Sequence, residues 1–276
     1  MQGLHNHFVI VDGRDLPYKP TINETIQICD VSTGVGGDQL LVIEPPTAKG
    51  AASGAYAFMR IINIDGRDAE ACGNATRCFG WLMLEETGRD EIVLETIVGP
   101  LRCWRKGDKQ VSVEMGRIST RWDLIPLAKE VDTLRVPLTS GPLKNGVALN
   151  IGNPHIVFFV DDLDALNVPE LAGPIQNDDL FPQKVNVGVA QKMSNTHLRL
   201  SVFERPGLLT KACGSGACVA TRAAQLLGLT DKKEVKVEML AGSVNVTLEE
   251  DSNAILTGSV EFCFSGRLTG REGRAV

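Results

Sequence analysis

The tetrapeptides Ala71-Cys72-Gly73-Asn74 and Ala212-Cys213-Gly214-Ser215 lie in opposite halves of the chain. Each precedes a run with helical character, residues 75–86 in the first half and 216–227 in the second. A cysteine directly ahead of a helix lies at the positive end of the helix dipole, beside unpaired backbone N–H groups, and both favour the thiolate. Two such cysteines predict a pair, one thiolate and one thiol, that removes a proton from one face of a carbon and delivers one to the other.

The segments around the two motifs follow the same order in both halves. Short strands lead to a polar loop, the Ala-Cys-Gly motif, a helix and further strands. We expect strands at 8–11, 40–43, 57–64, 91–95, 101–105 and 111–115, and again at 146–150, 155–160, 184–191, 197–203, 234–240, 243–248 and 254–260. The repeated order predicts two similar domains, with a boundary near residues 117–120 and the two cysteine loops at a shared cleft.

Composition limits the functional classes. The chain has 276 residues, 43% of them hydrophobic and 22% charged, which is ordinary for a soluble protein long enough for two domains. A net charge of −6 without a basic run argues against nucleic-acid binding. The longest apolar stretch, 78–84, is too short to span a bilayer, and the start resembles no signal peptide, so we expect a cytoplasmic protein without membrane contact.

The seven cysteines predict neither a disulfide framework nor a metal site. Their odd number argues against structural disulfides in a chain without a secretion signal. The gaps from Cys72 to Cys78 and from Cys213 to Cys218 differ from the spacing of structural zinc sites, and the four histidines do not cluster beside them. We expect Cys78 and Cys218 to be small core residues on the two helices.

Several motifs together resemble diaminopimelate epimerases, in order and over nearly the whole chain. They are Asn63-x-Asp65-Gly66 before the first cysteine motif, Glu204-Arg205 before the second, Gly34-Val35-Gly36-Gly37-Asp38-Gln39, Gly152-Asn153-Pro154-His155, and Phe181-Pro182 with Val185-Asn186-Val187-Gly188. The resemblance implies an α+β fold with two structurally similar domains, each a mostly antiparallel sheet or barrel around a central helix. The domains would be 1–118, joined by the segment 263–276, and 119–262.

The resemblance also implies the activity and the roles of single residues. The family inverts LL-2,6-diaminopimelate to the meso isomer without pyridoxal phosphate or another cofactor, in lysine and peptidoglycan precursor synthesis, and it suggests a homodimer. Cys72 would be the base towards the LL isomer and Cys213 towards the meso isomer, with His155 supporting a thiol. Glu204 would hold the α-ammonium and Arg205 the distal carboxylate. The remaining substrate-binding positions would be Asn6, Gln39, Asn63, Gly73, Asn74, Asn153, Asn186, Gly214 and Ser215.

The proposed chemistry is physically reasonable without a coenzyme. With no electron sink, the protein itself has to stabilise a carbanion, and backbone N–H groups at two helix N-termini can do so by gripping the α-carboxylate. We therefore expect Gly73-Asn74 and Gly214-Ser215 to hold that group, with glycine allowing close approach. A cysteine of ordinary pKa near 8.5 needs only a modest shift to act near neutrality.

The chain departs from the family pattern in three places. His5-Asn6-His7 replaces the usual Gly-Asn-Asp, and the strand that normally precedes it is almost missing, so we expect a start that is either truncated or misassigned. Ala75 stands where glycine is common. The run 206–210 places an apolar residue where a glutamate is usual, a change expected to affect loop geometry or thiol tuning more than recognition.

Three other functions compete with this interpretation. The first is a related racemase acting on another amino acid, such as histidine or hydroxyproline, against which Arg205 and the asparagines argue. The second is a hydrolase with a cysteine nucleophile and His155 as base, which leaves the second cysteine motif unexplained. The third is an amino-acid binder or redox sensor in which Cys72 and Cys213 form a switchable disulfide.

Overall fold

The computed structural model describes residues 1–69 and 72–268. The helices are α1 (Ile22–Cys29), α2 (Ala48–Ala52), α3 (Gly73–Thr87), α4 (Val168–Gln176) and α5 (Gly214–Leu226). The strands of the first half are β1 (Gln2–Gly3), β2 (Asn6–Asp12), β3 (Gln39–Glu44), β4 (Ala55–Asn63), β5 (Glu91–Thr96), β6 (Gly99–Gly107) and β7 (Gln110–Arg117). Those that follow are β8 (Val136–Ser140), β9 (Leu143–Asn150), β10 (Pro154–Val160), β11 (Asn186–Ser194), β12 (His197–Glu204), β13 (Leu208–Thr210), β14 (Glu234–Met239), β15 (Gly242–Leu248) and β16 (Asn253–Ser259).

The strand topology is duplicated. From β2 to β7 the neighbouring strands pair parallel, antiparallel, parallel, antiparallel and antiparallel. The path β10, β11, β12, β14, β15 and β16 repeats this series step for step. In each copy the long helix follows the third strand, α3 after β4 and α5 after β12. The α+β fold of two similar, sheet-dominated halves predicted from the sequence is therefore confirmed.

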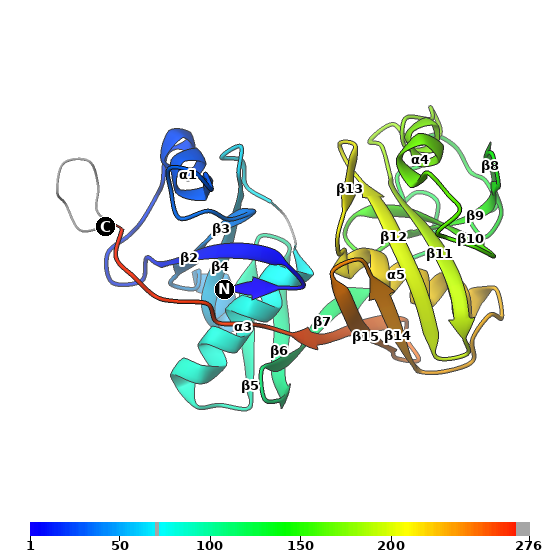
Figure 1. Ribbon diagram of the computed structural model, residues 1–276. Coiled ribbons are helices and arrows are strands. Elements are labelled where there is room, and N and C mark those ends of the chain that lie inside the picture. Colours follow the sequence, from blue (N-terminus) through cyan, green and yellow to red (C-terminus); the bar gives the residue numbers. More distant parts are fainter. Residues whose placement is uncertain (70–71, 269–276) are drawn as a thin grey trace.

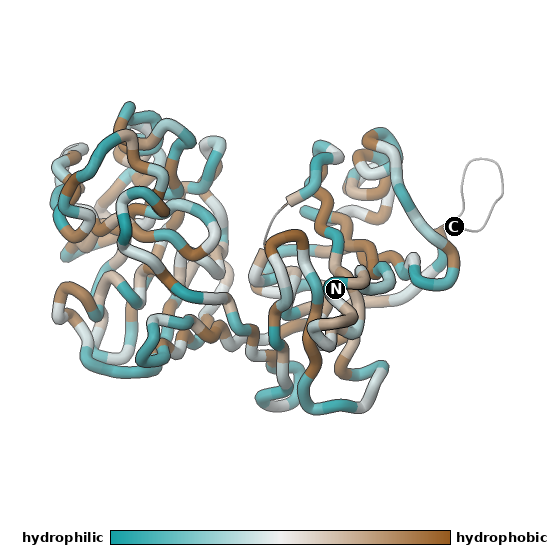
Figure 2. The backbone as a smooth tube through the Cα atoms, turned by 180° about the vertical axis from the view of Figure 1, so that it is seen from behind, coloured by the Kyte–Doolittle hydropathy of each residue, from teal (hydrophilic) through white to brown (hydrophobic). Residues whose placement is uncertain are grey.

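Each half wraps its strands around its long helix (Figure 1). Helix α3 buries Phe79, Met83 and Leu84 against the first-half strands, and α5 is almost entirely buried among the strands of the second. Smaller helices cover the outer surface of the sheets, α1 in the first half and α4 in the second. Seen from behind, hydrophilic stretches lie mainly on the peripheral loops of each half (Figure 2). This arrangement places both helix N-termini at the inner ends of the halves.

Strands β7 and β16 join the halves. They pair antiparallel from Arg117 opposite Asn253 to Gln110 opposite Ser259, which makes one continuous path of strands through the molecule. After β16 the chain returns to the first half, where Val260 packs into its core and Glu261 bridges to Gln2. We retain the division into domains 1–118 and 119–262 as a proposal; of the expected returning segment 263–276, residues 269–276 lie outside those described.

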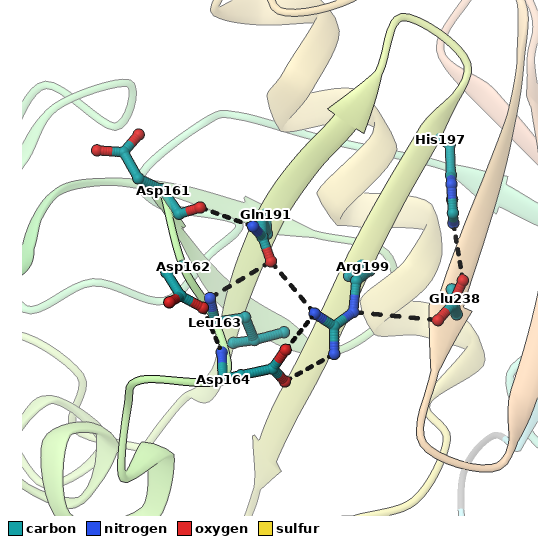
Figure 3. Close-up of polar contacts among 8 residues, drawn as sticks. All are labelled: Asp161, Asp162, Leu163, Asp164, Gln191, His197, Arg199 and Glu238. Atoms are coloured by element: carbon teal, nitrogen blue, oxygen red, sulfur yellow. Dashed lines mark hydrogen bonds and ion pairs between the residues drawn. The ribbon is translucent and has the colours of Figure 1, made fainter.

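A polar network on the second-half sheet fixes the loop that follows β10 (Figure 3). Arg199 of β12 donates from both terminal nitrogens to the carboxylate of Asp164, at 2.7 Å each, and lies 4.0 Å from Glu238 of β14. Glu238 also pairs with His197 at 3.0 Å. The network ties the loop to both members of the parallel β12–β14 pair, and because its charged groups are all partly exposed, it lies at the surface.

Three helices are absent from the sequence expectations. They are α1, α2 and α4, and α4 occupies the connection expected to be irregular because of its prolines. The expected strands and long helices agree with the structure to within about two residues at most ends.

Candidate functional site

Cys72 and Cys213 occupy the same position in their halves. Each is the N-cap residue of its long helix, and their backbone angles are similar, φ −151° and ψ 106° for Cys72 and φ −135° and ψ 110° for Cys213. The following glycines bring the two helix N-termini into contact. A side-chain carbon at Gly214 would lie 3.5 Å from Gly73 Cα and 2.8 Å from Leu256 of β16, and one at Gly73 would lie 3.0 Å from the same leucine. A side chain at Gly214 would therefore displace Leu256 and fill the space between the two termini.

The duplicated topology places the predicted polar residues in equivalent pairs. Asn63 and Glu204 end the third strands, each nine residues before its cysteine. Gln39 lies opposite Asn63 in the β3–β4 register, and Asn186 occupies the corresponding place beside Glu204, since Val187 pairs with Phe203.

Asn6 and Asn153 complete the equivalence. Asn6 lies two residues before Phe8, which pairs with Gln39, and Asn153 lies two residues before His155, which pairs with Asn186. The two halves therefore present matching side chains, and His155 takes the place that Phe8 has in the first half.

In the first half, amides surround Cys72. The thiol donates to Asn6 Oδ1 at 3.7 Å, and Asn74 Nδ2 donates to the same oxygen at 3.4 Å. Asn6 Nδ2 in turn donates to Asp38 Oδ2 at 3.0 Å. Behind them, the buried Arg77 donates to Asn74 Oδ1 at 2.8 Å. These contacts fix the orientation of each amide next to the thiol.

Asn6 is positioned by a tight hairpin between β1 and β2. Leu4 and His5, the two residues of the turn, have φ values of 54° and 57°, which suit the primed turns that join twisted strands. A leucine is costly there, and Leu4 offsets the cost by burying its side chain in the core of the second half. The start of β2 is thus held by both halves.

In the second half, hydroxyl and imidazole groups surround Cys213. Its sulfur lies 3.5 Å from Ser215 Oγ and accepts a hydrogen bond from Gly216 N at 3.4 Å. His155 Nε2 lies 3.1 Å from Ser215 Oγ and 3.1 Å from Asn153 Oδ1. His155 reaches the thiol through Ser215 and makes no direct hydrogen bond with it, and its supporting role stays a prediction.

The imidazole of His155 is fully buried, and burial followed by the charge of Arg205 lowers its pKa to about 3. The ring is therefore neutral at physiological pH. Its Nδ1 has no hydrogen-bond partner among residues 1–69 and 72–268.

Glu204 and Arg205 end β12 beside the second-half site. Glu204 Oε1 accepts a hydrogen bond of 2.6 Å from Thr210 of β13, and the Arg205 backbone N–H donates to Asn186 Oδ1 at 3.0 Å. The Arg205 guanidinium donates to the carbonyl of Gln183 at 3.0 Å. Strand β13, which carries the departure at 206–210, therefore supports Glu204, and its Leu208 and Leu209 remain exposed.

Gln39 and Asn63 form a smaller polar pair in the first half. Gln39 Nε2 donates to Asn63 Oδ1 at 2.9 Å. Gln39 Oε1 is buried without a partner in the described part of the chain. A buried acceptor of this kind is costly unless a ligand group donates to it.

Both N-cap thiols have raised pKa values, contrary to the modest lowering expected from the helix N-termini. Burial raises the pKa of Cys72 to about 11, opposed by the backbone N–H of Ala75 and reinforced by the charge of Glu204. Burial and then Glu204 raise the pKa of Cys213 well above its ordinary value. Desolvation outweighs the helix termini, and Glu204 acts on both sulfurs, which places its carboxylate within electrostatic reach of each.

Four residues of this region were not expected from the sequence. Asp38 and Arg77 support the amides near Cys72, while Thr210 and Gln183 support Glu204 and Arg205. Arg77 carried a signal in the sequence, since it is the single charge in the otherwise uncharged run 72–84. The departure at Ala75 is accommodated as an ordinary, fully buried helical residue.

Comparisons with known proteins identify the family. The family model described as diaminopimelate epimerase matches residues 1–120 and 147–263. The chain belongs to the diaminopimelate epimerase family. Diaminopimelate epimerase of Rhodospirillum centenum is 42% identical over 269 residues, which cover 98% of this chain and 91% of that protein. The enzyme of the same name from Caulobacter vibrioides is 40% identical over 280 residues, covering 97% and 96%. The chain is accordingly an isomerase.

Solved structures share the fold at low sequence identity. A phenazine biosynthesis protein of the PhzF family from Bacillus anthracis superposes with a TM-score of 0.61 at 17% identity, covering 94% of this chain and 92% of that one. A hydroxyproline epimerase from Agrobacterium vitis, with bound trans-4-hydroxy-L-proline, superposes with a TM-score of 0.58 at 14% identity, covering 94% and 86%. In the part of the chain that the structure describes, no helix has the length and hydropathy needed to cross a membrane.

Proposed function

We propose that the chain interconverts LL- and meso-2,6-diaminopimelate by a two-base mechanism that needs no cofactor. The observation that carries this proposal is the equivalence of Cys72 and Cys213, two N-cap thiols at helix N-termini that meet over one strand. Two acid–base groups from different halves can address opposite faces of one carbon, which a single base cannot do without turning the substrate.

The backbone N–H groups of Gly73-Asn74 and Gly214-Ser215 hold the α-carboxylate in this proposal. Two helix N-termini converge at these residues, and their dipoles favour negative charge. As the α-proton leaves, charge spreads onto the carboxylate, and fixed amide dipoles stabilise it in the transition state.

The proton transfers balance without an external reagent. A thiolate takes the α-proton, so that the C–H bond breaks as an S–H bond forms. The opposite thiol then gives its proton to the other face, which restores the C–H bond and leaves the second sulfur as thiolate. Following the family resemblance, Cys72 is the base towards the LL isomer and Cys213 towards the meso isomer.

Glu204 links substrate binding to thiol ionisation. Its negative charge raises the pKa of both cysteines in the free protein. When the α-ammonium of the substrate pairs with Glu204, the field at the two sulfurs becomes less negative, and thiolate formation becomes easier. The substrate would thus help to activate its own base.

The distal end of the substrate falls to Arg205 and the amides. The Arg205 guanidinium can grip a carboxylate in a bidentate manner, and Gln39 Oε1, which has no partner among the described residues, offers an acceptor for an ammonium group. The amides of Asn6, Asn63, Asn153 and Asn186 supply the remaining polar contacts. A second zwitterionic centre explains this set better than the single centre of histidine or hydroxyproline does.

A substrate comparison tests the function. Purified protein without added pyridoxal phosphate should convert LL-diaminopimelate to the meso isomer, and should leave L-histidine and trans-4-hydroxy-L-proline unchanged. Conversion of either alternative in place of diaminopimelate would contradict the proposed substrate. The Cys72→Ala variant then tests whether the observed conversion depends on this thiol.

The wider context follows from the same proposal. The product would supply lysine and peptidoglycan precursor synthesis in the cytoplasm, and we propose that the enzyme acts as a homodimer, to be checked by solution scattering.

A further inference from the structure

Arg77 is a fully buried arginine directly behind the first cysteine motif. It lies on α3, five residues after Cys72, and its exposed fraction is 0%. Its hydrogen bonds within residues 1–69 and 72–268 go to neutral oxygens, Asn74 Oδ1 at 2.8 Å and the carbonyl of Gly73 at 3.5 Å. Burying a guanidinium in this way is expensive, which indicates a role that an apolar residue could not fill.

The guanidinium begins a chain of oriented amides that ends at the thiol. Because a guanidinium only donates, Asn74 has to present its oxygen to Arg77 and its NH₂ group to Asn6. The carboxylate of Asp38 only accepts, so Asn6 directs its NH₂ group there and its oxygen towards Cys72. The donor-only and acceptor-only ends leave each amide a single orientation.

The second half has no counterpart to this cation. The position five residues after Cys213 is Cys218, a small buried thiol, and Ser215 replaces Asn74. Arg77 lies within electrostatic reach of three thiols, Cys72, Cys78 and Cys218. The positive charge of Arg77 therefore lowers the pKa of Cys72 from within the first half, while the negative charge of Glu204 raises it from the second half.

We propose that Arg77 is a positioning residue for Cys72, which rests on the proposed function only in treating Cys72 as an acid and base. When Cys72 is a thiol, the oriented Asn6 Oδ1 accepts a hydrogen bond from its S–H group. When Cys72 is a thiolate, the positive charge of Arg77 stabilises the negative charge on its sulfur. A cysteine that alternates between the two states in every turnover needs both forms of support.

The test is the alkylation rate of Cys72 by iodoacetamide at about pH 8, with the modified cysteine identified by mass spectrometry. Since only the thiolate reacts, loss of the cation in Arg77→Met should slow alkylation of Cys72 about tenfold, which corresponds to a rise of about one pKa unit. The rate at Cys213 should change about twofold or less. Turnover should fall about tenfold or more, and KM should rise by a smaller factor, because Arg77 would reach the substrate only through Asn74 and Asn6.

Two further variants keep the test decisive. Arg222→Met removes an arginine from α5 whose described contact is with Gln225, and it should alter neither rate. Arg77→Lys keeps the charge but not the planar fork, so Cys72 should alkylate within about twofold of the native rate while kcat falls.

A folded Arg77→Met protein with native alkylation of Cys72 overturns the proposal. If that variant does not fold, a tenfold slower alkylation in Arg77→Lys overturns it as well, because the charge is still present. The alkylation readout needs no substrate, so it stays informative if the protein proves to act on a different amino acid.

Discussion

The two halves share one strand order but surround their cysteines with different chemistry. In the first half Cys72 faces neutral amides backed by the buried Arg77, whereas in the second Cys213 faces Ser215 and the region of Glu204 and His155. The duplicated fold thus supplies two equivalent N-cap positions, and the substitutions between the copies make the pair asymmetric. In the proposed reaction, the proton that leaves one face of the carbon and the proton that arrives at the other would therefore meet different surroundings.

The largest expected effect tests whether the halves are equal partners. Cys72→Ala and Cys213→Ala should each lower kcat by a factor of about 10³ or more, because each removes one of two obligatory proton carriers. Conversion measured by chiral chromatography would show this. Cys103→Ala, a buried cysteine of the first-half core, is the matched control and should keep nearly full activity. Substantial turnover in only one of the two site variants would break the equivalence.

The second prediction concerns Glu204, whose counterpart in the first half is the neutral Asn63. Glu204→Gln should lower kcat/KM about 100-fold through loss of the ammonium partner, yet alkylation of both thiols should become faster, because removal of the charge lowers their pKa values. Iodoacetamide labelling with mass spectrometry measures the second effect. Asn63→Gln, the equivalent position of the first half, should weaken binding without speeding alkylation. Slower alkylation in Glu204→Gln would contradict the effect assigned to the Glu204 charge on the pKa values of the two thiols.

The third prediction concerns His155, which occupies the position that the apolar Phe8 has in the first half. The folded protein holds His155 neutral with a pKa of about 3, whereas the unfolded chain protonates it near 6.5. Protonation therefore favours unfolding as pH falls from 6.5 towards 3, and this residue should remove roughly 2 kcal/mol of stability between pH 6.5 and 4.5. Urea unfolding at the two pH values should show a smaller loss in His155→Gln. His197→Gln, at the surface beside Glu238, serves as control; an unchanged pH dependence in His155→Gln would contradict the burial argument.

The smallest effect is expected from the surface network of the second half. Arg199→Met removes the pairs with Asp164 and Glu238, but exposed pairs contribute little because water and salt screen them. The midpoint of thermal unfolding should move by about 2 °C or less, and activity should not change. A large loss of either would show that the loop after β10 is coupled to the site.

Much of this architecture could be predicted from the sequence, because its signals are local. The strand alternation, the two Cys-Gly motifs and the helices after them depend on side-chain periodicity and on caps. Helix α4 was missed because Pro174 lies inside it, and a proline normally breaks a helix. Helix α1 carried a usable signal, the capping box of Thr21 and Glu24, but it is only eight residues long.

The electrostatics of the site could not be predicted in the same way. The pKa values of Cys72 and Cys213 depend on burial and on Glu204, which is distant from Cys72 in sequence. The pairing of Asn6 with Asp38 and of Gln39 with Asn63 depends on strand register, which no local pattern specifies. The complete burial of Arg77, on which its proposed role depends, results from tertiary packing that its position in an uncharged run only hints at.

Isotope transfer in deuterium oxide tests most directly whether one cysteine removes the α-proton and the cysteine of the other half delivers the new one. In a single turnover starting from LL-diaminopimelate, the meso product should carry solvent deuterium at one α-carbon, and the unconverted substrate should keep its protium, because different sulfurs remove and deliver the proton. Product that retains the original protium would mean that one base both takes and returns it, and the two-cysteine account would be wrong.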